Sequence, residues 1–222
     1  MMRKLLPLWA LLLGGCVAAP SPTRPAVPVP AGVSEARLVA GSWTLQSGVF
    51  LMEQRAEFDF RGHKLEMRGL MRLDTRAGRA RLVAIDDLGI KLFDLTVTRD
   101  GQTLNSVLPQ LAKYPRLGEG IAASVRRIFL APRPSAGDTL QAEPTAYVLS
   151  RPWKGGTLRF TFGGRVPVLQ SAEATGGSAW RIDYFTYRRQ QGIRYPSRIV
   201  LTDTQAHYRL TLWLDSMRPS DE

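Results

Sequence analysis

The sequence predicts a mainly β protein, an incomplete antiparallel β-barrel of about eleven strands whose mouth is covered by one α-helical lid. Two observations favour this fold. From Leu38 onward, apolar side chains recur at every second residue over most of the chain, which is typical of half-buried strands. Residues 115–130 are the exception, because their apolar residues recur at three and four positions, as on one face of a helix.

The clearest strand lies in the first half of the chain. Between residues 64 and 73 an apolar face alternates with a charged face: Leu65, Met67, Met71 and Leu73 against Lys64, Glu66, Arg68 and Arg72. Gly69 replaces one apolar member of this stripe, which predicts a bend or a β-bulge. A preceding stripe consists of Trp43, Leu45, Val49 and Leu51. Further strands are expected at 57–61, 79–85, 90–98 and 103–107.

One amphipathic helix of about four turns is expected within residues 115–130. Its apolar face consists of Leu117, Ile121, Val125 and Ile128, and the prolines at positions 132 and 134 end it. Strands are expected again in the second half of the chain, at 147–150, 158–162, 166–174, 180–187, 193–202 and 206–214.

A sheet of this size must cover its apolar face. Roughly ten strands are the usual limit for a twisted open sheet, so we expect this one to curl. One helix covers only part of the concave side, and the interior of such a half-barrel either fills with side chains or encloses a ligand cavity. Met52, Met67 and Met71 would line a cavity if they point inward, and ordinary core packing is the alternative for each.

The N-terminus predicts export and lipid attachment. Arg3 and Lys4 precede an apolar run at residues 5–13, which is shorter than the roughly 20 residues that span a bilayer. Leu13-Gly14-Gly15-Cys16 resembles the cleavage site of bacterial lipoproteins, and Cys16 is the single cysteine of the chain. We therefore expect a signal peptide at 1–15 and a lipid-modified Cys16. The alternative is a secretory signal in which the cysteine is accidental.

Residues 16–37 are expected to tether a folded domain at 38–216, which a tail at 217–222 follows. Five prolines between positions 20 and 30 favour an extended spacer. An aspartate after the cysteine would resemble an inner-membrane retention signal, whereas Val17 favours sorting to the outer membrane. The predicted location is the periplasmic face of the outer membrane, with the protein held there by lipid.

The sequence indicates no particular reaction. It contains no Gly-x-Ser-x-Gly elbow and no Walker-type motif. His63 and His207 are candidate bases for a hydrolase, but no nucleophile motif lies near them, which favours exposed turn or strand residues. Asp86, Asp87 and Asp94 are more readily explained by loop solvation than by a cation site. We therefore expect no cofactor, no metal and no enzyme activity.

The chain is strongly basic, with 30 Lys+Arg against 19 Asp+Glu and a formal charge of +11. Arginines are concentrated in two regions: Arg55, Arg61, Arg68, Arg72, Arg76, Arg79 and Arg81, then Arg181, Arg188, Arg189, Arg194 and Arg198. Nucleic acid is not expected as a partner of an exported, lipid-anchored protein. Three alternatives explain this charge: contact with an anionic membrane surface, contact with an acidic partner protein, and a surface that only keeps the protein soluble.

Several segments together resemble a known family: GSWTLQSGVFLMEQRAEFDF, KLEMRGLMRLD, DDLGIKLFDLTV and, near the C-terminus, GIRYPSRIVLTDTQAHYRLTLWLDSM. With the lipoprotein signal, the proline-rich tether and the single helix, they resemble outer-membrane lipoproteins often encoded with aryl-polyene biosynthesis genes. Those proteins are in turn similar to the lipoprotein carriers LolA and LolB. The resemblance covers residues 38–216 and implies an incomplete β-barrel with a helical lid around an acyl-binding cavity.

The resemblance also implies which residues form the cavity and its lid. Cys16 matches the acylated cysteine of LolB-type proteins. The candidates for cavity wall and lid are Leu65, Met67, Met71, Leu73, Phe93, Leu95, Leu117, Ile121, Val125, Phe160, Phe162, Ile199 and Leu201. One feature departs from the family. LolB-like proteins expose a bulky apolar residue on a loop between strands, and the candidate loop here, residues 74–78, has none.

Three hypotheses for function follow. The first is a monomeric, membrane-anchored carrier that binds membrane lipid or acylated cargo, of the lipoprotein or aryl-polyene-lipid type, with a periplasmic LolA-like carrier as a candidate partner. The second is a scaffold lipoprotein that docks an acidic partner through its arginine-rich surface. The third is a lipid hydrolase that uses His63 or His207.

Overall fold

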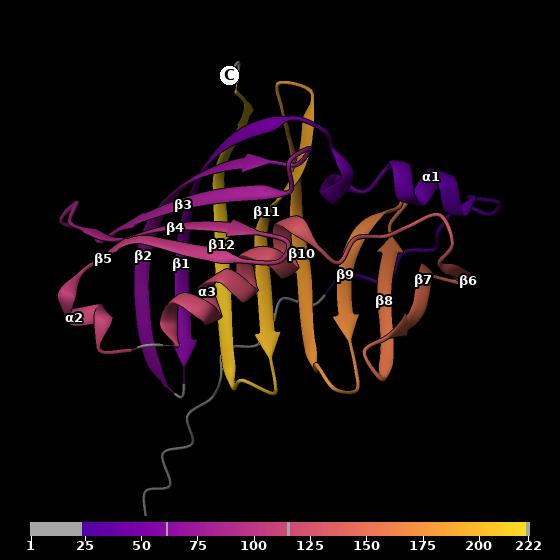
Figure 1. The fold of residues 1–222 in the computed structure, drawn as a ribbon. Helices are drawn as coiled ribbons and strands as arrows, with labels where there is room; N and C mark the ends of the chain where they lie inside the picture. The colour runs from indigo at the N-terminus through magenta and orange to yellow at the C-terminus, as the bar shows by residue number, and fades with distance from the viewer. Residues whose placement is uncertain (1–23, 61, 115, 221–222) are drawn as a thin grey trace, which may run out of the picture.

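The strands form one antiparallel sheet (Figure 1) in the computed structural model, which describes residues 24–60, 62–114 and 116–220. Twelve strands are hydrogen-bonded in the order β5-β4-β3-β2-β1-β12-β11-β10-β9-β8-β7-β6. Their bounds are β1 Val49–Phe60, β2 His63–Asp74, β3 Arg79–Ile85, β4 Lys91–Thr98, β5 Gln102–Val107, β6 Thr139–Glu143, β7 Ala146–Trp153, β8 Gly156–Gly163, β9 Val168–Ala174, β10 Trp180–Gln190, β11 Ile193–Asp203 and β12 Tyr208–Pro219. Because β1 pairs with β12 while β5 and β6 do not pair, the barrel is open between β5 and β6.

The helical lid lies in the connection between these two edge strands. This connection contains the short helix α2 Pro109–Ala112, the α-helix α3 Leu117–Val125 and one turn of π-helix, η2 Arg126–Leu130. In Figure 1, β3–β5 turn away from the upright strands β10–β12, and α3 crosses the concave side in front of β1 and β12. The predicted incomplete barrel and its helical lid are confirmed. No helix within the described ranges is long and apolar enough to cross a membrane.

The sequence missed the short elements that precede β1, and it also missed helix α2 and strand β6. Residues 35–40 form helix α1 (Glu35–Ala40), because the Ser34 side chain accepts a hydrogen bond from the Arg37 amide and caps it. A 3-10 turn, η1 Trp43–Leu45, follows, and β1 begins only at Val49. The predicted stripe through Val49 and Leu51 was therefore wrong. Phe50 and Met52 of β1 are buried, and Val49 and Leu51 are only half-buried.

The N-terminal segment packs on the sheet from Arg24 onward. The Val29 amide donates to the Pro144 carbonyl, and the Tyr147 hydroxyl donates to the Pro30 carbonyl. Further along, Trp43 enters the core, with its ring 6.0 Å from Phe129 and 5.6 Å from Tyr184. Residues 24–37, which the sequence analysis assigned to the tether, therefore pack against the folded domain. At the other end, β12 continues past residue 216, where the domain was expected to end, to Pro219.

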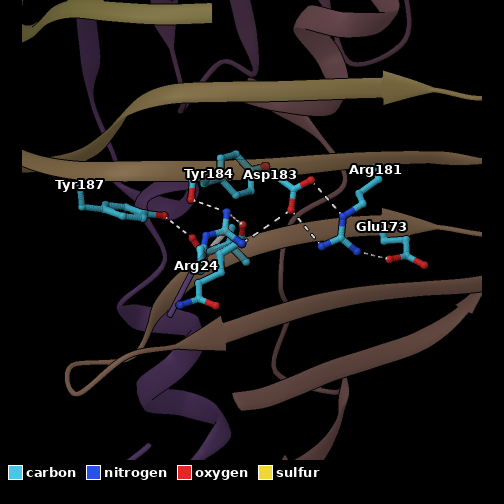
Figure 2. Close-up of polar contacts among 8 residues, drawn as sticks. Arg24, Glu173, Arg181, Asp183, Tyr184 and Tyr187 are labelled. Carbon is cyan, nitrogen blue, oxygen red and sulfur yellow. Dashed lines mark hydrogen bonds and ion pairs between the residues drawn. The ribbon is translucent and has the colours of Figure 1, made fainter. Parts of the chain in front are cut away.

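Arg24 fills a split in the sheet (Figure 2). Strands β9 and β10 pair only from Trp180 to Asp183, and beyond that point they separate. The Arg24 guanidinium donates to the carbonyls of Gln170 at 2.8 Å and Tyr184 at 2.7 Å, one on each strand. It also lies 3.7 Å from Asp183 and stacks on the Phe185 ring at 4.3 Å. One side chain therefore bonds two carbonyls that the strand ladder leaves unpaired.

Gly69 does not introduce the predicted bulge. Strand β2 pairs without a register shift on both sides of Gly69, with Gln54 of β1 and Ala84 of β3. The irregularity lies one strand away, in the β1–β12 pair between Glu53 and Gln54. A Cβ atom at position 69 would lie 3.1 Å from the Gln54 side chain and from Leu82, so glycine here makes room for a side chain of the neighbouring strand.

Candidate ligand cavity

An apolar cavity of about 40 Å³ lies between the sheet and the lid helix. Its walls come from the inner faces of β1–β4 and β12 and from the buried side of α3 and η2. The lining residues are Gln54, Ala56, Phe58, Met67, Gly69, Leu82, Ala84, Phe93, Ile121, Ser124, Val125, Ile128, Phe129, Leu210 and Leu212. The cavity is therefore confined to one half of the sheet.

Small side chains create this space. Gln54, Gly69, Ala84 and Phe93 face one another in register across β1, β2, β3 and β4. Gly69 and Ala84 lie in the middle of this row, and Ala56 lies beside it on β1. The atoms that line a void lose dispersion contacts, so a void is unfavourable in a close-packed interior. Here the small residues of this row decide where the void lies.

The predicted cavity residues fall into three groups. Met67, Phe93, Ile121 and Val125 line the cavity. Leu65 and Leu117 are half-buried and pack against the margin of the core. The others are buried in the core and do not line the cavity: Met71, Leu73, Leu95, Phe160, Phe162, Ile199 and Leu201. Cys16 lies outside the described residues.

Large side chains fill much of the interior, which leaves no room for a wide acyl-binding cavity in this state of the protein. Phe160 and Phe162 are 1% and 0% exposed, and Trp43 packs on Tyr184 in the same half of the sheet. Eleven lining residues were not among the predicted cavity residues. Six of them lie on β1–β3: Gln54, Ala56, Phe58, Gly69, Leu82 and Ala84. The others are Ser124 of α3, Ile128 and Phe129 of η2, and Leu210 and Leu212 of β12. Leu210 and Leu212 were detectable, because they belong to the alternating pattern of an expected strand. Gln54 was not, because a polar residue interrupts such a pattern.

Polar contacts hold the lid to the turn between β11 and β12. The Arg127 guanidinium pairs with the carboxylate of Asp203, which is buried and also accepts the amides of Gln205 and Ala206. The hydroxyls of Ser124 and Tyr208 lie 2.8 Å apart in a hydrogen bond. Burial raises the pKa of Tyr208, against the opposing effect of its bonds to Ser124 and Arg127. We call this set of contacts around Arg127 the β11–β12 latch.

A second set of contacts holds the other side of the same helix. The Arg126 guanidinium donates to the Thr98 carbonyl at 2.9 Å and to the Gln102 side chain, both in the hairpin between β4 and β5. Two consecutive arginines of η2 therefore bind two hairpins on opposite sides of the lid. The Ala131 amide bonds to the Arg126 carbonyl five residues earlier, and such π-turns occur often at functional sites.

The residues considered for other chemistry lie outside the cavity. His63 and His207 are exposed and do not line it. The Asp86 side chain accepts the amides of Leu88 and Ile90 and shapes a turn. Within the described ranges, no three His, Cys, Asp or Glu side chains are grouped in a way that could hold a metal ion.

Many of the arginines form ion pairs on the outer surface of the sheet. Arg55 pairs with Asp215, Arg81 with Asp94, and Arg181 with both Glu173 and Asp183. Arg188 and Arg189 are exposed near the end of the β10–β11 hairpin. Part of the positive charge is therefore neutralised by carboxylates on the same strand or on neighbouring strands.

The turn between β3 and β4 exposes a bulky apolar residue. Leu88 is 86% exposed and Ile90 is 47% exposed. The loop considered in the sequence analysis, residues 74–78, has no such residue.

Comparison with known proteins places these observations in a family. The family described as protein of unknown function DUF3261 matches residues 51–214. The chain belongs to the DUF3261 family. This matched range runs from β1 to β12 and contains every lining residue of the cavity. No curated protein matches the chain.

Two solved structures share the fold of this DUF3261 member. One is a LolA superfamily protein from Nitrosomonas europaea, 11% identical, with a TM-score of 0.56, covering 86% of this chain and 96% of its own. The other is a domain named for outer membrane lipoprotein sorting, from Vibrio parahaemolyticus, 11% identical, with a TM-score of 0.56, covering 80% and 87%. The LolA-like fold predicted from the sequence is confirmed. At this identity the likeness concerns the fold alone.

Proposed function

We propose that this protein is a non-enzymatic carrier that takes up the acyl chain of a lipid or of acylated cargo beneath α3 and η2. The observation that supports this most strongly is an apolar cavity under a helix that polar contacts hold to two hairpins. Solved structures of similar fold have names that refer to LolA and to lipoprotein sorting, which is consistent with a carrier.

Uptake of a chain requires the lid to move. A cavity of about 40 Å³ has room for about three water molecules, since each needs roughly 10–15 Å³. An acyl chain of sixteen carbons therefore enters only when α3 and η2 move away from β1–β4. Burial of each CH2 contributes about 0.8 kcal/mol, so ten methylenes contribute about 8 kcal/mol toward displacing the lid. Water can replace the polar partners of Arg126 and Arg127 during this movement.

The same proposal includes a place at the membrane. Lipid on Cys16 would hold the protein to the periplasmic face of the outer membrane. Arg24 is eight residues from Cys16, so its α-carbon lies at most about 29 Å from that of the anchor. The exposed Leu88 at the β3–β4 turn offers a second contact with the bilayer. The cargo would be a membrane lipid, an aryl-polyene lipid or an acylated protein. A periplasmic LolA-like carrier would deliver it, and the protein would receive it as a monomer.

Lipid binding tests the proposal directly. Residues 17–222, which retain every described residue, are purified, and bound lipid is identified by native mass spectrometry. Equilibrium binding of radiolabelled hexadecanoate is then measured. We expect co-purified lipid and saturable binding. Ala56→Leu enlarges a lining side chain and should weaken binding at least tenfold, whereas Ala142→Leu, at an exposed position of β6, should leave it unchanged. Absence of both co-purified lipid and hexadecanoate binding would refute the carrier.

A scaffold role is the second candidate, because Arg188 and Arg189 are exposed at one hairpin end. In that case a double substitution of these arginines by glutamine should fail to complement a strain that lacks this protein, while lipid binding persists. If Ala56→Leu fails to complement that strain and the double arginine variant complements it, the carrier is supported instead.

A further inference from the structure

One polar side chain interrupts the apolar inner face of β1. Phe50, Met52, Gln54 and Ala56 all point inward along this strand, and Gln54 is only 6% exposed. Its side chain lines the cavity under the lid. Within the described part of the chain, its Oε1 atom is buried and has no hydrogen-bond partner. A buried amide oxygen without a partner costs free energy comparable to a lost hydrogen bond, so a leucine of similar size would be better accommodated.

The neighbouring strands are built to accept this amide. Gly69 lies directly opposite Gln54 on β2, and Ala84 follows on β3. A Cβ atom at position 69 would approach the Gln54 Cγ and Nε2 atoms to 3.1 Å, which is closer than ordinary contact. The absence of a side chain at position 69 therefore leaves the Gln54 amide its space beside the cavity.

The other polar side chain of the lining is already engaged. The Ser124 hydroxyl bonds to the Gly120 carbonyl at 2.9 Å and to the Tyr208 hydroxyl at 2.8 Å. Gln54 is therefore the lining side chain that has hydrogen-bonding capacity to offer a ligand. Its carboxamide can accept a hydrogen bond through its oxygen.

We propose that Gln54 selects the cargo by accepting a hydrogen bond from a hydroxyl or amide N–H on the acyl chain. This inference rests on the proposed carrier function and specifies its substrate class: acyl chains that carry a hydrogen-bond donor within the buried part. An unsubstituted chain leaves the Gln54 oxygen unpaired in a closed apolar site, and it therefore binds less tightly. A donor-bearing chain satisfies that oxygen.

The test compares matched ligands on matched variants. Binding of hexadecanoate is measured beside that of two hydroxyhexadecanoates, one with the hydroxyl near the carboxylate and one with it at mid-chain. The unsubstituted protein should bind at least one hydroxylated chain about tenfold more tightly than hexadecanoate. Gln54→Leu should lose this preference and bind hexadecanoate more tightly. Gln141→Leu, at an exposed glutamine on β6, should behave like the unsubstituted protein.

Each outcome separates this inference from the carrier proposal. If hexadecanoate binds but neither hydroxylated chain is preferred, or if Gln54→Leu keeps the preference, the role of Gln54 is refuted and the carrier stands. If no chain binds the unsubstituted protein, both are refuted. Gln54→Met replaces Gln54→Leu if the latter does not fold, because a flexible side chain of similar length fits the same space.

Discussion

The two halves of the sheet solve the problem of a large apolar face in different ways. On β7–β10 the inner face carries large side chains that fill the interior: Tyr147, Leu149, Phe160, Phe162, Leu169 and Tyr184. On β1–β3 it carries several small ones, Ala56, Gly69, Ala80 and Ala84, and the lid helix takes up much of the remaining space. The filled half has Trp43 of the N-terminal segment as an additional plug. Side-chain size along the inner rows therefore decides where a curled sheet keeps a cavity.

Truncation in the filled half should produce the largest loss of stability. Phe160→Ala removes a fully buried ring and should lower the free energy of unfolding by about 3–5 kcal/mol. Urea unfolding measures this effect. Hexadecanoate affinity, measured where the variant is still folded, should remain within about twofold, because Phe160 does not line the cavity. A large loss of affinity would show that the two halves are not separate in function.

Loss of the β11–β12 latch should affect both stability and uptake. Arg127→Gln leaves the buried Asp203 carboxylate without its cationic partner and should cost about 1–3 kcal/mol. Because the lid then opens more often, the rate of hexadecanoate uptake in stopped-flow measurements should rise. Arg116→Gln, at an exposed arginine before α3, is the control. An unchanged uptake rate in a destabilised Arg127→Gln variant would argue that the latch does not gate the cavity.

The bond between the N-terminal segment and the filled half should have a smaller effect. Arg24→Gln removes the donor shared by the Gln170 and Tyr184 carbonyls and should destabilise the protein by about 1 kcal/mol. Limited proteolysis should then cleave more readily near residues 24–33, while uptake by the other half is unaffected. Arg159→Gln, exposed on β8, serves as the reference. Equal protease resistance in both variants would show that Arg24 does not fasten this segment.

Much of the fold was predictable because it depends on alternation. The stripe of Met67, Met71 and Leu73 lies on the inner face as expected, and the helix that contains Ile121 and Val125 covers it. Element boundaries were less predictable, because helix α1 depends on one capping serine and not on periodicity.

The cavity itself was the part that the sequence could not locate. Apolar pattern identifies the inner face, but a cavity depends on which small residues meet across strands, and this requires the register. Gly69 illustrates the difference. In the sequence it interrupts a stripe and predicts a bulge, whereas in the sheet it faces Gln54 and makes room for its amide. Phe160 of β8 and Leu201 of β11 follow the same alternation as Met67 and are buried, but they do not line the cavity.

The smallest expected effect concerns the ion pair between Arg81 of β3 and Asp94 of β4, in the half of the sheet that contains the cavity. Arg81 donates two hydrogen bonds to Asp94 and Asn105 donates another, and the bond to Arg81 is the main cause that lowers the pKa of Asp94 to about 2. An unfolded aspartate has a pKa of about 3.9. The contribution to stability is therefore complete above about pH 5 and is lost as the pH falls from about 4 toward 2.

In Arg81→Gln this contribution should be reduced. The urea midpoint of the variant should fall less steeply than that of the unsubstituted protein between pH 4 and pH 2, and NMR titration should show the Asp94 pKa shifted upward. Because Arg81 is largely exposed, the change is expected to be small near neutral pH and weaker still at high salt. Identical slopes in both proteins would mean that this ion pair adds nothing to the backbone hydrogen bonds that hold β3 to β4.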